Sequence, residues 1–275
     1  MRLRRATHIV RRVLFALAVV SIAIIVAGPS VAQDARPLRG VALVIGNSAY
    51  EHLGTLVNPA NDARAIESML SGLGFETTLV SDRNARLLAR DLDNFLNDAD
   101  GADVALVYYA GHGIEAAGEN FLIPVDADLS ALEAGGEKLV PVSAFIERLR
   151  ATVPIAILML DACRDNPFPP GSMVQVDAIS PPAPIGQSGL GEARGGAPLS
   201  PPAPGTESYG TVISFAAAPG KAALDGEAGS NSPYAAAIHR HFDAMVGEEF
   251  GVVMRMIAEE VYLKTSGRQQ PWINE

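Results

Sequence analysis

A cysteine and a histidine each follow an apolar run in this sequence, and side chains of these two types can together cleave an acyl bond. The chain's single cysteine, Cys163, comes after the run PIAILML, within LDACRDNPF. His112 lies 51 residues earlier, between two glycines in YYAGHG, and it also follows an apolar run. A thiolate can attack a carbonyl carbon, and an imidazole can carry the proton to the leaving amine. The pair therefore predicts acyl-transfer chemistry, provided that the fold brings the two residues together.

Each residue also has an interpretation without chemistry. A lone cysteine is often a small buried hydrophobe or forms an intermolecular disulfide, and a histidine between glycines can lie in a turn. The two types together, each at the expected end of a strand, favour the chemical interpretation. Backbone N–H groups, most simply those of Gly113 and Cys163, would then stabilise the developing oxyanion.

Apolar runs alternate with amphipathic stretches along the chain. They predict strands at 39–46, 74–80, 103–109, 121–125, 154–160 and 209–216, and helices at 61–73, 84–99, 142–150, 233–245 and 249–264. Continuously apolar strands separated by helices indicate an α/β fold, with a mostly parallel sheet covered by helices on both faces. Ligand sites in such sheets lie beyond the carboxyl ends of the strands. The turns after Gly46, Tyr109 and Leu160 should therefore meet at one edge.

The first 32 residues have the layout of a secretory signal peptide. An apolar run of 15 residues, 13–27, follows a basic segment and precedes small residues at Ser30 and Ala32. The run is short for a membrane span of roughly 20 residues, although an uncleaved anchor is the alternative. We therefore expect an exported protein, periplasmic or secreted, that contacts a membrane only if this leader is uncleaved.

The remaining chain, 33–275, is long enough for one domain with a full core. We divide it into a large part at 39–166, a Pro/Gly-rich linker at 167–208 and a small part at 209–275. The whole chain has a net charge of −10, and loss of the leader removes five Arg and no acid, which leaves −15. Nucleic acid is an improbable partner, because phosphate binding needs a basic surface.

The motifs YYAGHG and LDACRDNPF resemble the catalytic core of the caspase-like cysteine peptidases, in the bacterial metacaspase-like (orthocaspase) branch. Their spacing agrees with the general caspase signature, in which the histidine precedes the cysteine by about 50 residues. ALVIGNSAY, LVNPANDA, SFAAAPGKAALDG, NSPYAAAI and GRQQPW extend the resemblance over residues 39–273. It implies a caspase-like three-layer sandwich, a catalytic dyad of His112 and Cys163, and protein or peptide substrates.

The resemblance also implies a specificity. Asp62, in ANDA, and Asp161 match acidic positions that line the substrate pocket of metacaspases. Two carboxylates there would select Arg or Lys before the cleaved bond through charge-assisted hydrogen bonds. Asp62 has an alternative role near a helix N-terminus. If Arg is preferred, Arg194 in GEARGG is a candidate self-processing site; otherwise it is an ordinary charged loop residue.

The sequence also bears on calcium and on two alternative functions. Some metacaspases use calcium, but this sequence has no D-x-D-x-D-G loop, so calcium is possible and unassigned, and no cofactor is required. A non-catalytic caspase-like interaction module is the main alternative function. A phosphate-binding or receiver-like domain with Asp161 as acceptor is disfavoured, because neither a G-x-G-x-x-G motif nor a P-loop is present.

Overall fold

The computed structural model describes residues 37–128, 130, 132, 139–163, 166–176, 180–186, 190, 210–218 and 223–274. Backbone contacts separate Met1–Pro37 from Leu38–Glu275, and the second unit is the one described below. The predicted leader, 1–32, lies outside the described residues. Within the described ranges, no helix has the length and apolar character needed to cross a membrane.

A mostly parallel sheet forms the centre of the second unit. Its main path has the order β10-β9-β6-β3-β1-β2, in which only β10 runs antiparallel to its neighbour. The strands of this path are β1 (Gly40–Gly46), β2 (Glu76–Ser81), β3 (Val104–Ala116), β6 (Ile155–Cys163), β9 (Gly210–Phe215) and β10 (Trp272–Asn274). Beside it, β4 (Glu119–Leu122) pairs with β3 and with β5 (Val140–Pro141).

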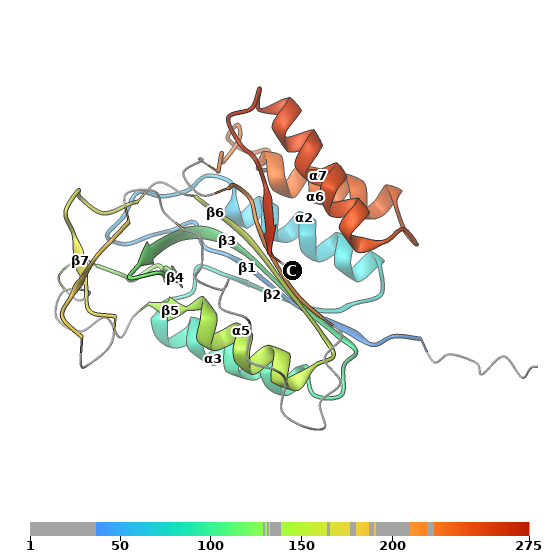
Figure 1. Cartoon of the computed structure of the whole chain (residues 1–275), viewed down its shortest axis with the longest axis horizontal. Coiled ribbons are helices and arrows are strands. Elements are labelled where there is room, and N and C mark those ends of the chain that lie inside the picture. Colours follow the sequence, from blue (N-terminus) through green and yellow to red (C-terminus); the bar gives the residue numbers. More distant parts are fainter. Residues whose placement is uncertain are drawn as a thin grey trace, which may run out of the picture. The chain divides into compact units, whose positions relative to one another are not determined.

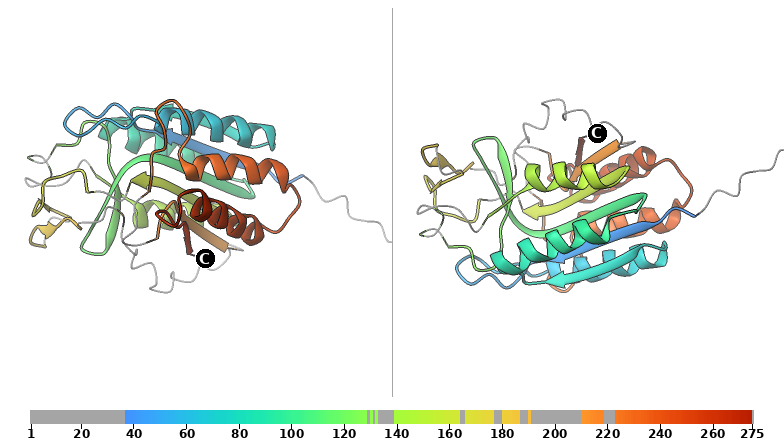
Figure 2. Two further views of the ribbon diagram at one scale, coloured as in Figure 1. Left: turned by 90° about the horizontal axis from the view of Figure 1, so that it is seen from above. Right: turned by 90° about the horizontal axis from the view of Figure 1, so that it is seen from below.

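Helices cover both faces of this sheet, as Figures 1 and 2 show. One face carries α2 (Pro59–Gly72), α6 (Pro233–Ala244) and α7 (Phe250–Lys264), and the other carries α3 (Ala85–Asp98) and α5 (Val142–Thr152). Each face has its own cluster of buried apolar side chains, to which the strands contribute alternate residues. The expected three-layer α/β sandwich is confirmed.

Two strands extend further than the sequence predicted. Strand β3 continues past Tyr109 through the GHG motif to Ala116, and β6 continues past Leu160 to Cys163. The turns predicted directly after Tyr109 and Leu160 were therefore wrong. Glycine lowers strand propensity, but here β6 pairs with β3 as far as His112, and β4 pairs with it from Gly113 onward. These ladders outweigh the local preference.

The described part of 167–208 packs against the domain more closely than a surface linker would. It contains the short antiparallel pair β7 (Met173–Val174) and β8 (Ala183–Pro184). Its buried apolar side chains are those of Phe168, Val174, Ile185 and Leu190. Ile185 also forms a bridge to Ala116 at the end of β3. The segment therefore contributes to the core at the end of the sheet that carries His112.

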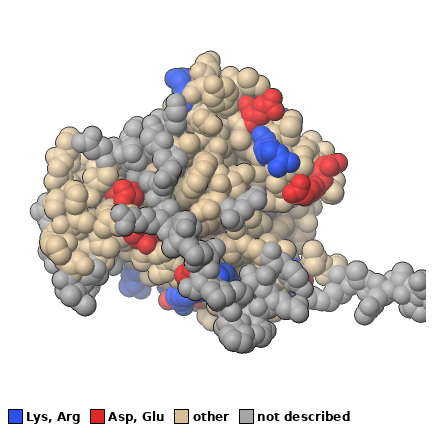
Figure 3. All heavy atoms as spheres, in the orientation of Figure 1, with Lys and Arg blue, Asp and Glu red and all other residues tan. Residues whose placement is uncertain are grey.

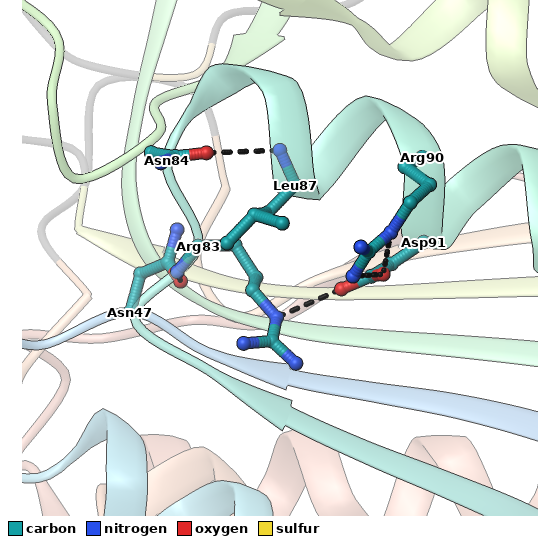
Figure 4. Close-up of polar contacts among 6 residues, drawn as sticks. All are labelled: Asn47, Arg83, Asn84, Leu87, Arg90 and Asp91. Carbon is teal, nitrogen blue, oxygen red and sulfur yellow. Dashed lines mark hydrogen bonds and ion pairs between the residues drawn. The ribbon is translucent and has the colours of Figure 1, made fainter.

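Side chains fix the turns at the carboxyl ends of β1 and β2 (Figure 4). Asn47 is fully buried, and its Oδ1 accepts the backbone N–H of Arg83 at 2.9 Å. Arg83 Nε in turn donates to Asp91 Oδ2 of α3 at 2.7 Å. Asn84 caps α3 by accepting the N–H of Leu87 at 2.9 Å. The loop that follows β1 therefore begins from a fixed position.

Candidate active site

The register of β3 and β6 brings the two sequence-predicted catalytic residues together. His112 and Cys163 are paired Cα positions of neighbouring parallel strands. Two residues earlier in each strand, Ala110 is paired with Asp161. The sequence alone does not show that these strands are neighbours. The sheet order confirms that they are.

His112 is held at its backbone and at one ring nitrogen. Its N–H donates to Tyr50 Oη at 2.7 Å, and its carbonyl oxygen accepts from Tyr109 Oη at 2.8 Å. Ring Nε2 lies 2.8 Å from the carbonyl oxygen of Gly54. The ring of Tyr50 packs against the imidazole, with centroids 4.5 Å apart. Little freedom of orientation is left to the ring.

These contacts determine which ring nitrogen can act as a base. A carbonyl oxygen only accepts hydrogen bonds, so the neutral ring carries its proton on Nε2 and its lone pair on Nδ1. Nδ1 of His112 is buried and has no hydrogen-bond partner within the described part of the chain. Burial lowers the pKa of His112, opposed by the bond to Gly54 and the charge of Asp225. At neutral pH the imidazole is therefore a neutral base.

Close packing explains the glycine before the histidine. A Cβ at Gly111 would lie 2.7 Å from the hydroxyl oxygens of both Tyr50 and Tyr109. A larger residue would displace the two tyrosines that bind His112. Gly113 is similarly crowded, because a Cβ there would lie 2.9 Å from Leu190 Cδ2.

A pocket with three carboxylates adjoins this histidine. Its lining includes Asp62, Asp161, Asp225, Gly111 and Ser232. The three acids come from α2, from β6 and from the segment between β9 and α6. Gly111 is the residue before His112, so the pocket lies next to the predicted catalytic pair.

Ser232 connects two of the carboxylates. Asp62 Oδ1 accepts the backbone N–H of Ser232 at 2.8 Å and Asn231 Nδ2 at 3.0 Å. Asp161 Oδ2 accepts Ser232 Oγ at 2.5 Å and Tyr108 Oη at 2.9 Å. In the alternative interpretation, Asp62 serves the N-terminus of α2. Its side chain points instead to the segment before α6, which favours the pocket assignment.

The two buried carboxylates resist ionisation. Burial, together with the nearby charge of Asp161, raises the pKa of Asp62 to about 8. Burial also raises the pKa of Asp161 to about 6, against hydrogen bonds from Ser232 and Tyr108 that lower it. Their side chains are only 1% and 8% exposed. A cation that enters the pocket would therefore supply the positive charge that these two buried carboxylates need in order to ionise.

Sequence reasoning missed Asp225, Tyr50 and Gly54. Asp225 is half-buried, and its Oδ2 accepts the N–H of Val57 at 3.0 Å. The resemblance covered its segment, SFAAAPGKAALDG, but no pattern singled out this acid. Gly54 contributes a backbone carbonyl, which any residue type could supply. Only the fold reveals these contributions.

The self-processing site and the oxyanion donors are two sequence predictions that the structure does not test. Arg194 lies outside the described residues. The oxyanion donors stay a prediction: Gly113 lies in β3, where it pairs with Leu122 of β4, and Cys163 is the last residue of β6. Among the residues that the structure describes, no group of three or more His, Cys, Asp or Glu side chains could hold a metal ion, so calcium has no assigned site.

Comparison with known proteins decides the family. The family model for the caspase domain matches residues 39–275. The chain belongs to the caspase domain family. This is a family of cysteine peptidases, which act on protein substrates. The metacaspase-like branch is a finer assignment and stays a prediction.

Relatives of this caspase domain include two mammalian proteins. The mucosa-associated lymphoid tissue lymphoma translocation protein 1 homolog of Mus musculus is 37% identical over 97 residues, 34% of this chain and 12% of the relative. The Homo sapiens protein of that name is 37% identical over 87 residues, 32% of this chain and 11% of the relative. The matches thus span only about a tenth of those proteins.

A solved structure supports the fold independently. Caspase-1 from Spodoptera frugiperda superposes with a TM-score of 0.57, at 13% identity and with 86% of each chain covered. At this identity the likeness concerns the fold alone. It agrees with the three layers in Figure 1.

Proposed function

We propose that this caspase domain is a cysteine endopeptidase that cleaves peptide bonds after Arg or Lys. One observation carries the proposal. His112, whose buried Nδ1 has no hydrogen-bond partner among the described residues, is in register with Cys163 beside a pocket that holds three carboxylates. A nucleophile, a base and a cation-binding pocket are what such cleavage requires.

The chemistry follows from the state of His112. Nδ1 takes the proton from the Cys163 thiol, and the thiolate adds to the carbonyl carbon of the bond to be cleaved. The protonated Nδ1 then gives its proton to the leaving amine, and a thioester remains on Cys163. Water, deprotonated by the same nitrogen, hydrolyses the thioester and releases the acid. Backbone N–H groups of Gly113 and Cys163 would stabilise each tetrahedral oxyanion.

The preference for basic residues follows from the pocket's electrostatics. Asp62 and Asp161 hold raised pKa values because burial disfavours their charged forms. A guanidinium or ammonium group would offset that cost and draw both carboxylates into ionised, hydrogen-bonded pairs. An acidic side chain in the same pocket would meet like charge. The pocket therefore favours Arg or Lys and rejects Asp.

The alternative is a non-catalytic caspase-like module that binds partners. Nothing in a binding role requires a neutral imidazole that is held at three points and whose Nδ1 has no partner in the described part of the chain. The contacts of Tyr50, Tyr109 and Gly54 to His112 therefore favour the enzyme.

Hydrolysis of short fluorogenic peptides tests the proposal. Peptides that end in Arg, Lys or Asp are offered to the wild type and to Cys163→Ala. We expect release after Arg and Lys, none after Asp, and none from the variant. No hydrolysis of any peptide would favour the interaction module. Activity that survives in Cys163→Ala would rule out the nucleophile.

We also propose that residues 1–32 direct export and are then removed. The basic segment, the 15-residue apolar run and the small residues at Ser30 and Ala32 support this proposal. Intact-mass measurement of protein recovered from outside the cytoplasm should find Gln33 as the first residue. Recovery of the full-length chain in the membrane fraction would favour the uncleaved anchor.

A further inference from the structure

Asn58 occupies the N-cap position of α2, where asparagine usually binds the helix's own free N–H groups. Here its side chain makes no such bond. The backbone carbonyl of Asn58 accepts the N–H groups of Asn61 and Asp62 at 2.8 and 2.9 Å. Helix capping therefore does not explain the residue type.

The Asn58 side chain binds a turn that lies far away in the sequence. Nδ2 donates to the carbonyl oxygens of Asp225 at 2.6 Å and Glu227 at 2.8 Å. Oδ1 accepts the N–H of Gly229 at 3.0 Å. The side chain is fully buried, so these three bonds satisfy one amide and fix three points of the turn.

The same short segment reaches the base and the pocket. Gly54 holds Nε2 of His112, Val57 donates to the Asp225 carboxylate, and Asn58 binds the Asp225 carbonyl. Asp225 is therefore held at its side chain by one residue and at its backbone by the next. Its position in the pocket depends on this double contact.

We propose that Asn58 is a positioning residue that holds Asp225 in the pocket and thereby sets the affinity for a substrate's guanidinium or ammonium group. The inference rests on the proposed function and extends it to a residue outside the pocket lining. Without the amide, the carbonyl groups of Asp225 and Glu227 lose their donor, and the turn that carries Asp225 relaxes away from the pocket. The base keeps its bond to Gly54.

Steady-state kinetics of Asn58→Ala on an Arg-ended peptide test the inference. We expect KM to rise about 10-fold, in line with the loss of these partly buried hydrogen bonds, while kcat changes less than about 2-fold. Asn61→Ala is the matched control, because Asn61 reaches the same segment only through a 3.5 Å contact to Ser230. That control should match the wild type.

A double-mutant comparison separates positioning from general destabilisation. In an Asp225→Asn background, Asn58→Ala should raise KM less than about 2-fold further, because its effect passes through Asp225. An unchanged KM in Asn58→Ala, or an equal 10-fold rise in both backgrounds, overturns the inference and leaves the proposed function standing. If the wild type is inactive on every Arg-ended and Lys-ended peptide, both the inference and the proposed function are contradicted.

A binding measurement keeps the inference testable without turnover. Agmatine, which carries a guanidinium group, should bind Cys163→Ala and raise its melting temperature. Adding Asn58→Ala should weaken that binding about 10-fold. If Asn58→Ala does not fold, Asn58→Ser, which keeps one donor, should weaken agmatine binding by a smaller factor. Binding equal to that of Cys163→Ala in the Asn58 variant that folds contradicts the inference.

Discussion

Contacts fix the backbone of His112 and one ring nitrogen, and within the described ranges they leave the lone pair of Nδ1 without a hydrogen-bond partner. Tyr50 accepts its backbone N–H, Tyr109 donates to its carbonyl, and Gly54 accepts the proton on Nε2. Burial keeps the ring neutral by lowering its pKa. These contacts are needed to present Nδ1, and substitution can remove the two tyrosine hydroxyls one at a time.

Tyr50→Phe removes the acceptor of the His112 N–H and keeps the aromatic ring. An unpaired buried donor costs about 1–3 kcal/mol, so the strand should shift at the base. We expect kcat on an Arg-ended peptide to fall about 10-fold, with KM unchanged. Tyr262→Phe, at a tyrosine that is 48% exposed on α7, is the control and should behave as wild type. An unaltered kcat in Tyr50→Phe would contradict the positioning role.

Asp62→Asn should improve stability while impairing substrate binding. The raised pKa of Asp62, about 8, means that the folded protein binds a proton that the unfolded chain has released above pH 4. The free energy of unfolding therefore falls as pH rises from about 4 to 8. Asparagine keeps the oxygen that accepts from Ser232 and removes this penalty.

We expect Asp62→Asn to raise the melting temperature by roughly 2–6 °C at pH 8, with a smaller rise at pH 5. KM for an Arg-ended peptide should rise about 10-fold at pH 8 through loss of a charge-assisted bond. Calorimetry at the two pH values and steady-state kinetics supply the measurements. A lower melting temperature at pH 8 would contradict the stability penalty assigned to the buried Asp62 carboxylate. An unchanged KM would contradict its role in substrate binding.

The residues of the site differ in how readily they can be identified from the sequence. Asp62 and Asp161 were predicted because the family resemblance marks their positions. Tyr50 and Asp225 lay inside matching motifs, but no property of their own singled them out. Gly54 acts through its backbone carbonyl, so residue type carries no information. Such contacts depend on three-dimensional proximity and need the fold.

At the scale of elements, the register of one strand pair brings the candidate catalytic residues together. Parallel pairing of β3 with β6 places His112 beside Cys163, and Ala110 beside Asp161. The sequence predicted both strands from their apolar runs but ended them early, because glycines and charged residues follow. The pairing of β3 with β6 and with β4 carries it through those residues. Propensity describes single segments, whereas strand ends depend on neighbours.

Gly111→Ala tests whether the packing of β3 matters for catalysis. The added Cβ would lie 2.7 Å from the hydroxyl oxygens of Tyr50 and Tyr109, so strand or tyrosines must move. We expect kcat/KM to fall at least about 100-fold, since a small misplacement of a reacting group is costly. Gly72→Ala, in α2 with open space around its Cβ, should keep wild-type activity. Equal activity of the two variants would contradict this account.

At the scale of the whole molecule, the sheet and its two helical layers were predictable, because strongly periodic segments determine an α/β sandwich. The β7–β8 pair, the buried Leu190 and strand β10 were missed, because they are short and lie among Pro and Gly residues. On the face drawn in Figure 3, the described basic side chains form no continuous surface and have acidic side chains among them.

Self-processing concerns the chain as a whole, and we expect it at Arg194. A protein that cleaves after Arg should separate its two parts there, since the GEARGG segment offers Arg among small residues. Purified wild type should yield two fragments whose masses place the cut after Arg194, and Cys163→Ala should stay intact. Cleavage of pure Cys163→Ala at the same bond would attribute the cut to another protease.

The most direct test of the central claim is covalent labelling of the wild-type chain by a peptidyl acyloxymethyl ketone, a thiol-selective reagent, followed by intact-mass measurement. The chain has one cysteine, so an adduct on a thiol can only be on Cys163. We predict one adduct from the Arg-ended reagent, none from the Asp-ended reagent, and none on Cys163→Ala. Equal labelling by both reagents, or no labelling by the Arg-ended one, would contradict a Cys163 peptidase with a pocket for basic side chains.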